Sequence, residues 1–200
     1  VDTQDNTKFN GGDFVGLSNK VEFVAQLGYT IMSVGSVFPT ERYDGGLVTS
    51  YEGFEPHFGT EEEFVSMINT YNSKKMGIMI DFPLSNVSAN HEWATTAEKA
   101  NWVKSVDEGV AKFDFTNNDV KAALIEQVVA LVEKYDLAGI RLTNIEEADT
   151  TFLNEVIAAI KAKKDIYVIA NSESDADFDA QVVNAMPQLF ADSFKNVDLS

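Results

Sequence analysis

The feature that most constrains the fold is an alternation of short apolar segments with longer amphipathic ones. The apolar segments are rich in β-branched residues and cover residues 30–38, 76–82, 138–143 and 166–171, with a shorter one at 181–184. Helical spacing of apolar residues occupies 17–27, 60–73, 118–135, 151–163 and 187–196. Strands that alternate with helices in this way predict an α/β fold with a mostly parallel sheet. Residues 85–118 interrupt the pattern, and we expect a polar excursion with short helical patches around 96–110.

The length and composition indicate one domain that spans residues 1–200. The chain has 200 residues, of which 44% are hydrophobic, and it contains 14 Phe, 6 Tyr and 2 Trp. This apolar surface is too large to remain in water, so the chain is expected to bury a core.

The charge of the chain excludes several classes of partner. There are 32 acidic residues against 15 basic ones, which gives a net charge of −17. Neither nucleic acid nor an anionic membrane surface is an expected partner, because both require clustered Lys and Arg. No apolar run reaches the length of a membrane span, so we expect no membrane insertion within this segment. The acidity itself is best explained by solubility.

Cysteine and histidine usage argues against a zinc site or a disulfide framework. The chain has no Cys, and its two histidines, His57 and His91, are far apart in sequence. The chain begins with Val, so we expect a processed product or a segment of a longer protein. An extracellular or cell-surface location is the expectation, and a cytoplasmic one is the alternative, because both are compatible with an absence of cysteine.

Four segments, in order and at matching spacing, resemble the α-amylase superfamily, the glycoside hydrolase family 13-like catalytic barrel. They are Gly11–Thr40, which contains VGSVFPT; Tyr51–Ile68, which contains EPHFGT; Asp81–Trp93; and Phe113–Asp149, which contains AGIRL. The resemblance implies a partial TIM-type (β/α) barrel that covers roughly strands 2 to 6. It also implies that the first and the last two strands of the barrel are missing from this segment.

The same resemblance implies that the catalytic positions have changed. The position of the family nucleophile is Thr143, and the position of the acid/base glutamate is Asn171. Two site-type residues, Asp81 and Arg141, are retained, and we expect them to form an ion pair at the mouth of the barrel. Other family positions differ as well. Ser85 and Asn86 occupy the positions of an Asn-His pair in the family, and Gly46 and Leu47 occupy those of a sugar-stacking Tyr and an Asp.

These changes predict that the domain is catalytically inactive. Retaining glycoside hydrolysis requires two carboxyl groups about 5–5.5 Å apart. A threonine hydroxyl is a poor nucleophile without an adjacent base, and an asparagine amide has no proton to transfer. The expected roles are therefore carbohydrate binding or a scaffold for a protein partner. The alternative is an active α-glucan hydrolase or transferase with a relocated pair, Glu173 with Glu146 or with Asp81.

Two further expectations concern ligands of the site. We expect no cofactor, and a calcium ion held by Asp81, Ser85, Asn86 and loop acids is a weaker alternative based on their oxygen atoms. An oligosaccharide is the expected small ligand, and aromatic residues could supply a platform for it. Of these residues, Trp93 is expected to be exposed in a loop, whereas aromatic residues at helical spacing are expected in the core.

Overall fold

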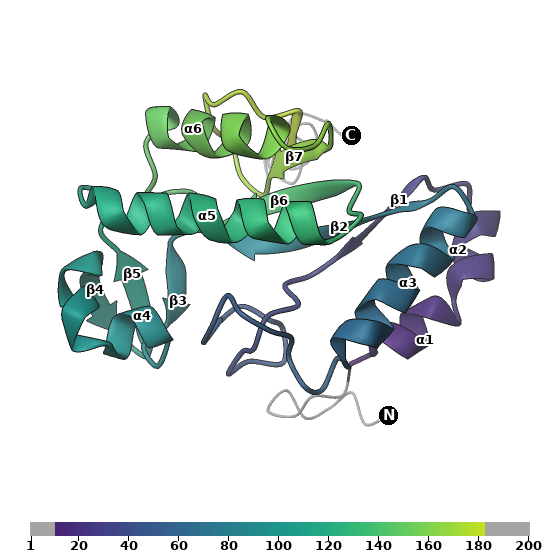
Figure 1. Cartoon of the computed structure of the whole chain (residues 1–200), viewed down its shortest axis with the longest axis horizontal. Helices are drawn as coiled ribbons and strands as arrows, with labels where there is room; N and C mark the ends of the chain where they lie inside the picture. The colour runs from purple at the N-terminus through teal and green to yellow at the C-terminus, as the bar shows by residue number, and fades with distance from the viewer. Residues whose placement is uncertain (1–10, 183–200) are drawn as a thin grey trace, which may run out of the picture.

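The computed structural model describes residues 11–182, and a five-stranded parallel sheet is its centre (Figure 1). The order of the strands in the sheet is β1-β2-β6-β7-β8. Their bounds are β1 Ile31–Val34, β2 Gly77–Pro83, β6 Gly139–Thr143, β7 Tyr167–Ala170 and β8 Ala180–Gln181. All four pairings are parallel, so the predicted α/β fold with a parallel sheet is confirmed.

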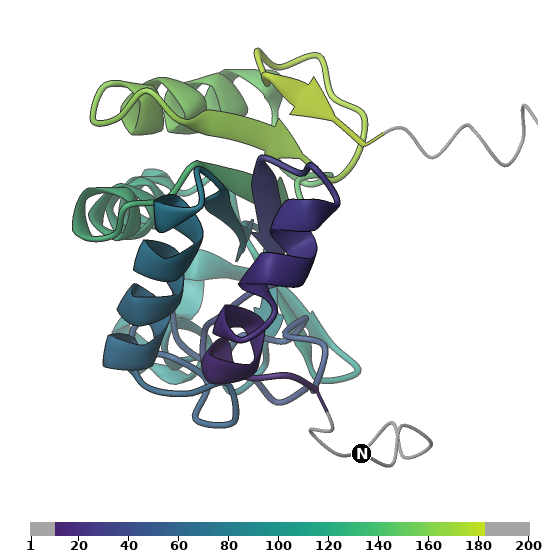
Figure 2. The same ribbon diagram turned by 90° about the vertical axis from the view of Figure 1, so that its right-hand side faces the viewer.

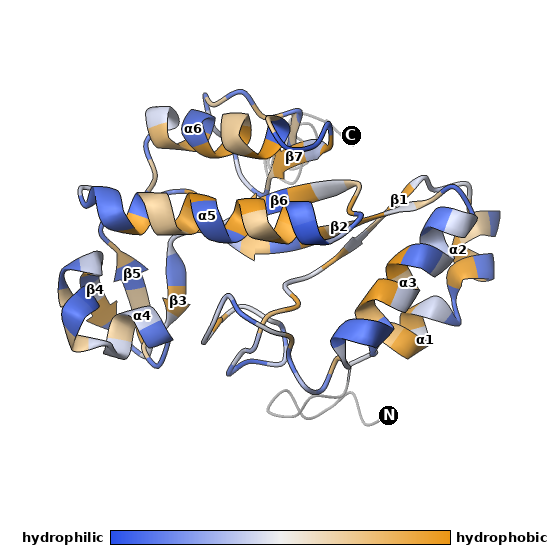
Figure 3. Cartoon of the chain, in the orientation of Figure 1, coloured by the Kyte–Doolittle hydropathy of each residue, from blue (hydrophilic) through white to orange (hydrophobic). Residues whose placement is uncertain are grey.

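Three long helices connect these strands, and all of them lie on the same side of the sheet (Figure 2). They are α3 Glu61–Ser73, α5 Asn118–Lys134 and α6 Thr150–Lys161. The start of α3 is fixed by a capping box, in which the Glu63 backbone N–H donates to the Thr60 hydroxyl and the Thr60 N–H donates to the Glu63 carboxylate. Hydrophobic and hydrophilic residues alternate along these ribbons, as amphipathic helices require (Figure 3).

The core lies between the helices and one face of the sheet. Alternate strand residues on that face are fully buried, namely Ile78, Ile80, Phe82, Ile140 and Leu142. Because strand side chains alternate between faces, the residues between them point to the other face. That opposite face carries Asp81, Arg141 and Thr143, and no helix of the described residues covers it (Figure 2).

The excursion after β2 folds differently from the prediction. It contains a three-stranded antiparallel sheet in the order β3-β5-β4, with β3 Asn86–Ser88, β4 Val103–Asp107 and β5 Val110–Phe113. Helical structure is confined to α4 Glu92–Thr95 and the 3₁₀ helix η1 Ala97–Trp102. The expected helical patches beyond residue 102 were wrong, because β4 and β5 form a hairpin that turns at Glu108 and Gly109, both with positive φ.

Three smaller differences concern boundaries. The single helix expected over 17–27 is two short helices, α1 Phe14–Ser18 and α2 Val21–Gln26, and the strand expected over 30–38 ends at Val34. After that point the carbonyl of Val37 accepts a hydrogen bond from the Glu55 N–H, so the chain has left the sheet. The helix expected over 187–196 and the end of the strand expected over 181–184 lie outside the described residues. Among residues 11–182, none of the helices combines the length and the apolar composition that a membrane span requires.

Candidate active site at the carboxyl edge of the sheet

The carboxyl ends of β2, β6 and β7 bring the predicted site residues to one edge of the sheet. The register pairs Asp81 with Arg141. It also pairs Leu142 with Ala170, and the Asn171 N–H donates to the Leu142 carbonyl at 3.1 Å, which extends the parallel ladder by one step. Thr143 and Asn171 are therefore neighbours on adjacent strands, which lie about 4.8 Å apart in a sheet.

The expected ion pair between Asp81 and Arg141 is present and bidentate. Arg141 Nε donates to Asp81 Oδ1 at 2.7 Å, and Nη2 donates to Oδ2 at 2.6 Å. The Asp81 side chain is 13% exposed and that of Arg141 is 30% exposed. This contact raises the pKa of Arg141. Because the pair uses both carboxylate oxygens, Asp81 is held as a structural partner of Arg141.

Asn171 carries an unsatisfied polar atom at this edge. Its side-chain oxygen Oδ1 is buried and has no hydrogen-bond partner in the structure of residues 11–182. A buried acceptor without a donor costs about 1–3 kcal/mol. A ligand hydroxyl that donated to this oxygen would recover that free energy, but it would reach the oxygen only after the side chains that cover it move.

The candidate substitute carboxylates lie on the loops that follow β6 and β7. Glu146 and Glu173 are both exposed. The Ser172 hydroxyl donates to Glu146 Oε1 at 3.3 Å, so the two loops are in contact next to Glu173. Glu147 instead forms ion pairs with Lys104 at 3.1 Å and with Lys112 at 3.2 Å, which lower its pKa and link this loop to the small sheet.

Two of the residues named for the calcium alternative are engaged by other groups of the protein. Asp81 gives both oxygens to Arg141, and the Ser85 hydroxyl donates to the backbone carbonyl of Asn144. Asn144 has a φ of 54°, a left-handed conformation that asparagine tolerates. Among residues 11–182, no group of three or more His, Asp or Glu side chains has an arrangement suited to a metal ion.

The prediction that Trp93 is exposed was wrong. Trp93 is 4% exposed, and its ring lies 5.3 Å from Tyr51, 5.4 Å from His91 and 5.2 Å from Trp102. Trp93 is the buried residue of α4 and lies between this helix and the small sheet. Trp93 therefore cannot serve as an open sugar platform.

A cavity away from the carboxyl edge was missed by the sequence reasoning. It lies between α5 and the segment that leads into α3, and Gln127, Ala130, Leu131 and Lys134 line it from α5. These four residues have the spacing i, i+3, i+4, i+7, so they form a mixed stripe beside the buried stripe of the same helix. That spacing was the available signal, although a stripe of mixed polarity does not by itself indicate a pocket.

Comparison with known proteins agrees with this architecture. The family model described as alpha amylase, catalytic domain, matches residues 2–108. "Alpha-amylase 3" of Schizosaccharomyces pombe is 23% identical over an alignment 192 residues long, and the match covers 78% of this chain but only 34% of that protein. Relatives of this kind are thus matched over a fraction of their length.

Solved structures show the same fold. An Anoxybacillus alpha-amylase superposes with a TM-score of 0.88 at 21% identity and covers 98% of this chain and 50% of its own. The alpha-amylase of Geobacillus thermoleovorans, solved with acarbose, gives 0.80 at 23% identity, over 98% of this chain and 46% of its own. The family model matches more than half of the 200 residues, so the chain belongs to the alpha-amylase family of enzymes, as a partial α/β barrel.

Proposed function

We propose that this chain is a catalytically inactive member of the alpha-amylase family that binds an α-glucan oligosaccharide at the carboxyl edge of its sheet. The observation that carries the proposal is the position of Thr143 and Asn171, side by side at the end of β6 and directly after β7. The family resemblance assigns the nucleophile and the proton donor to these two positions, and neither side chain is a carboxyl group.

The chemistry of the two side chains supports inactivity. A threonine hydroxyl attacks an anomeric carbon poorly unless a base removes its proton. An asparagine amide cannot protonate the leaving oxygen, although it can donate and accept hydrogen bonds. The adjacent position that carries a carboxylate, Asp81, is engaged by Arg141.

The same residues are suited to holding a neutral sugar. Asn171 Oδ1 lacks a donor, and the Thr143 side chain beside it offers a hydroxyl. Sugar hydroxyls both donate and accept, so they can satisfy these groups together. The alpha-amylase of Geobacillus thermoleovorans was solved with acarbose, which agrees with an oligosaccharide-type ligand for this fold. A scaffold role toward a protein partner lacks a comparable specific contact.

The test combines an activity assay with a binding assay on the purified chain. We expect no release of reducing sugar from maltoheptaose above the buffer rate. We expect binding of maltoheptaose by calorimetry, and Asn171→Ala should weaken it about fivefold or more, because one hydrogen bond contributes about 1 kcal/mol. Asn118→Ala, at the exposed start of α5, is the matched control. Release of reducing sugar would refute inactivity, and equal affinity of the Asn171 variant would refute binding at this edge.

The contact between Ser172 and Glu146 favours one alternative, an active enzyme whose carboxyl pair is Glu146 with Glu173. In that case maltoheptaose should be cleaved, and Glu173→Gln should abolish the cleavage while leaving the fold intact. Activity that persists in this variant would exclude Glu173 from the reaction.

A further inference from the structure

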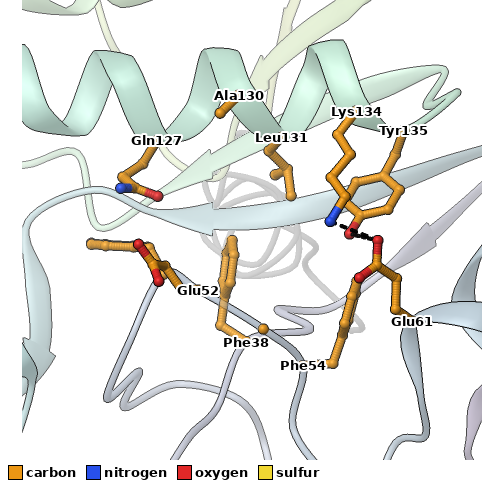
Figure 4. Close-up of a pocket in the computed structure, with 11 residues that line it drawn as sticks. Phe38, Glu52, Phe54, Glu61, Gln127, Ala130, Leu131, Lys134 and Tyr135 are labelled. Carbon is orange, nitrogen blue, oxygen red and sulfur yellow. Dashed lines mark hydrogen bonds and ion pairs between the residues drawn. The ribbon is translucent and has the colours of Figure 1, made fainter.

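A cavity of about 350 Å³ lies between α5 and the segment that leads into α3 (Figure 4). Its floor includes Phe38 and Tyr51, whose rings pack against Phe82 at 5.8 Å and 4.9 Å. Phe82 faces the helices, so the cavity is on the helix side of the sheet. It is thus a separate feature from the edge that carries Thr143 and Asn171.

The walls of this cavity are aromatic and aliphatic. Phe38, Phe54 and Leu131 point into it, and Tyr135 closes one end (Figure 4). The Phe54 ring is held by an edge contact to Tyr135 at 5.8 Å and by Phe64 at 4.8 Å. These rings are fixed by the core, so the cavity does not need to be ordered by a ligand.

The rim of the cavity is polar, and its two ends differ. At one end Glu61 accepts hydrogen bonds from the Tyr135 hydroxyl at 3.0 Å and from the Lys134 ammonium at 2.6 Å. Figure 4 shows Glu52 and Gln127 facing each other at the other end. Neither side chain has a hydrogen-bond partner within residues 11–182. One carboxylate and one amide are therefore available to a ligand.

These groups narrow the class of ligand. An anion would face Glu52 and Glu61 with one cation, Lys134, which Glu61 already neutralises. A small cation could pair with Glu52, but it would leave the aromatic and aliphatic walls of the cavity without a partner. A purely apolar ligand would cover Glu52 and Gln127 without giving them hydrogen bonds, which is costly. A neutral ligand with hydroxyl groups satisfies the carboxylate and the amide, and its C–H faces can pack on the rings.

We propose that this cavity is a second binding site, for one or two sugar rings of a neutral oligosaccharide. The choice of an α-glucan as its ligand rests on the proposed function. The volume falls within the range of about 300–1,000 Å³ that is usual for small-molecule sites.

The decisive variant is Ala130→Trp, which places an indole at the mouth of the cavity from an exposed position on α5. Ala122→Trp is the matched control, because Ala122 is exposed on the same helix and does not line the cavity. Both variants should keep the circular dichroism spectrum and the melting temperature of the parent chain. The ligand is maltoheptaose, measured by calorimetry, and binding is mapped by amide shifts over residues 127–134.

We expect Ala130→Trp to weaken binding at this site about tenfold or more and to remove the shifts over 127–134, whereas Ala122→Trp preserves both. Asn171→Ala should leave these shifts unchanged, because it affects only the carboxyl edge. Identical binding and identical shifts in the two tryptophan variants would overturn the second site. Loss in Ala130→Trp with no effect of Asn171→Ala would support this site and refute the edge site. An absence of shifts over 127–134 in the parent chain at millimolar sugar would also overturn the second site.

Discussion

Acidification should destabilise this fold through His91, whose side chain is fully buried. Its Nδ1 accepts a hydrogen bond from the Trp93 N–H at 3.1 Å, and its ring lies 5.0 Å from Tyr51 and 5.8 Å from Phe113. The other ring nitrogen, Nε2, has no hydrogen-bond partner within the described chain. Burial in this aromatic cluster, with a smaller effect of the Lys99 ammonium, lowers the pKa of His91 from 6.5 to about 4.

The direction and the size of the pH effect on stability follow from the difference between the pKa values of His91 in the unfolded and the folded chain. As the pH falls below 6.5, the unfolded chain binds a proton at His91 before the folded chain does, so the unfolded state is favoured. The contribution of neutral His91 to the free energy of unfolding is complete above pH 6.5 and is lost between pH 6.5 and about 4. At about 1.4 kcal/mol per pH unit, this range corresponds to roughly 3 kcal/mol of unfolding free energy.

The assay is urea unfolding followed by tryptophan fluorescence at several pH values from 7 to 4. The many carboxylates of the chain also titrate there, so the informative quantity is the difference between the parent chain and His91→Asn. The asparagine oxygen can still accept from the Trp93 N–H but cannot be protonated in this range. The parent should lose roughly 3 kcal/mol more than the variant. Parallel pH profiles of the two proteins would refute the reasoning.

Two predictions concern the ion pair and the helix start. Arg141→Met should cost about 2 kcal/mol of unfolding free energy, less than the usual 3–5 for breaking a buried pair because Arg141 is 30% exposed, and adding Asp81→Asn should recover most of the loss. If Arg141→Met alone were as stable in urea as the parent chain, this prediction would be wrong. Thr60→Ala should cost about 1 kcal/mol by removing the acceptor of the Glu63 N–H, whereas Thr70→Ala, within the same helix, should cost less in the same assay.

The sequence predicts best where local signals and burial agree. The helix expected over 60–73 agrees with α3 to within one residue, and its start is fixed by a capping box that involves only residues three apart. The positions of β2, β6 and β7 were predicted within one residue, because each is an apolar run buried against helices. The small sheet was missed because β4 has four exposed residues among its five, so it lacks a clear pattern.

Trp93 shows why the surface of the site could not be predicted in the same way. Its exposure depends on how residues far apart in sequence meet: Tyr51 from one loop, Trp102 from η1 and Phe113 from β5 all contact it. No local sequence pattern predicts these long-range contacts. The same limit applies to the cavity beside α5, whose walls come from four separate stretches of the chain.

The register of the parallel sheet explains why the altered positions, Thr143 and Asn171, are neighbours. Adjacent strands keep their residues opposite one another whatever the side chains are, so Thr143 and Asn171 meet because Leu142 pairs with Ala170. The hydrogen bonds of this ladder are made by the backbone, so they do not depend on whether a side chain carries a carboxyl group. The scaffold therefore does not depend on catalytic side chains, which is consistent with our proposal that the unpaired Asn171 oxygen and the polar groups beside it hold a sugar.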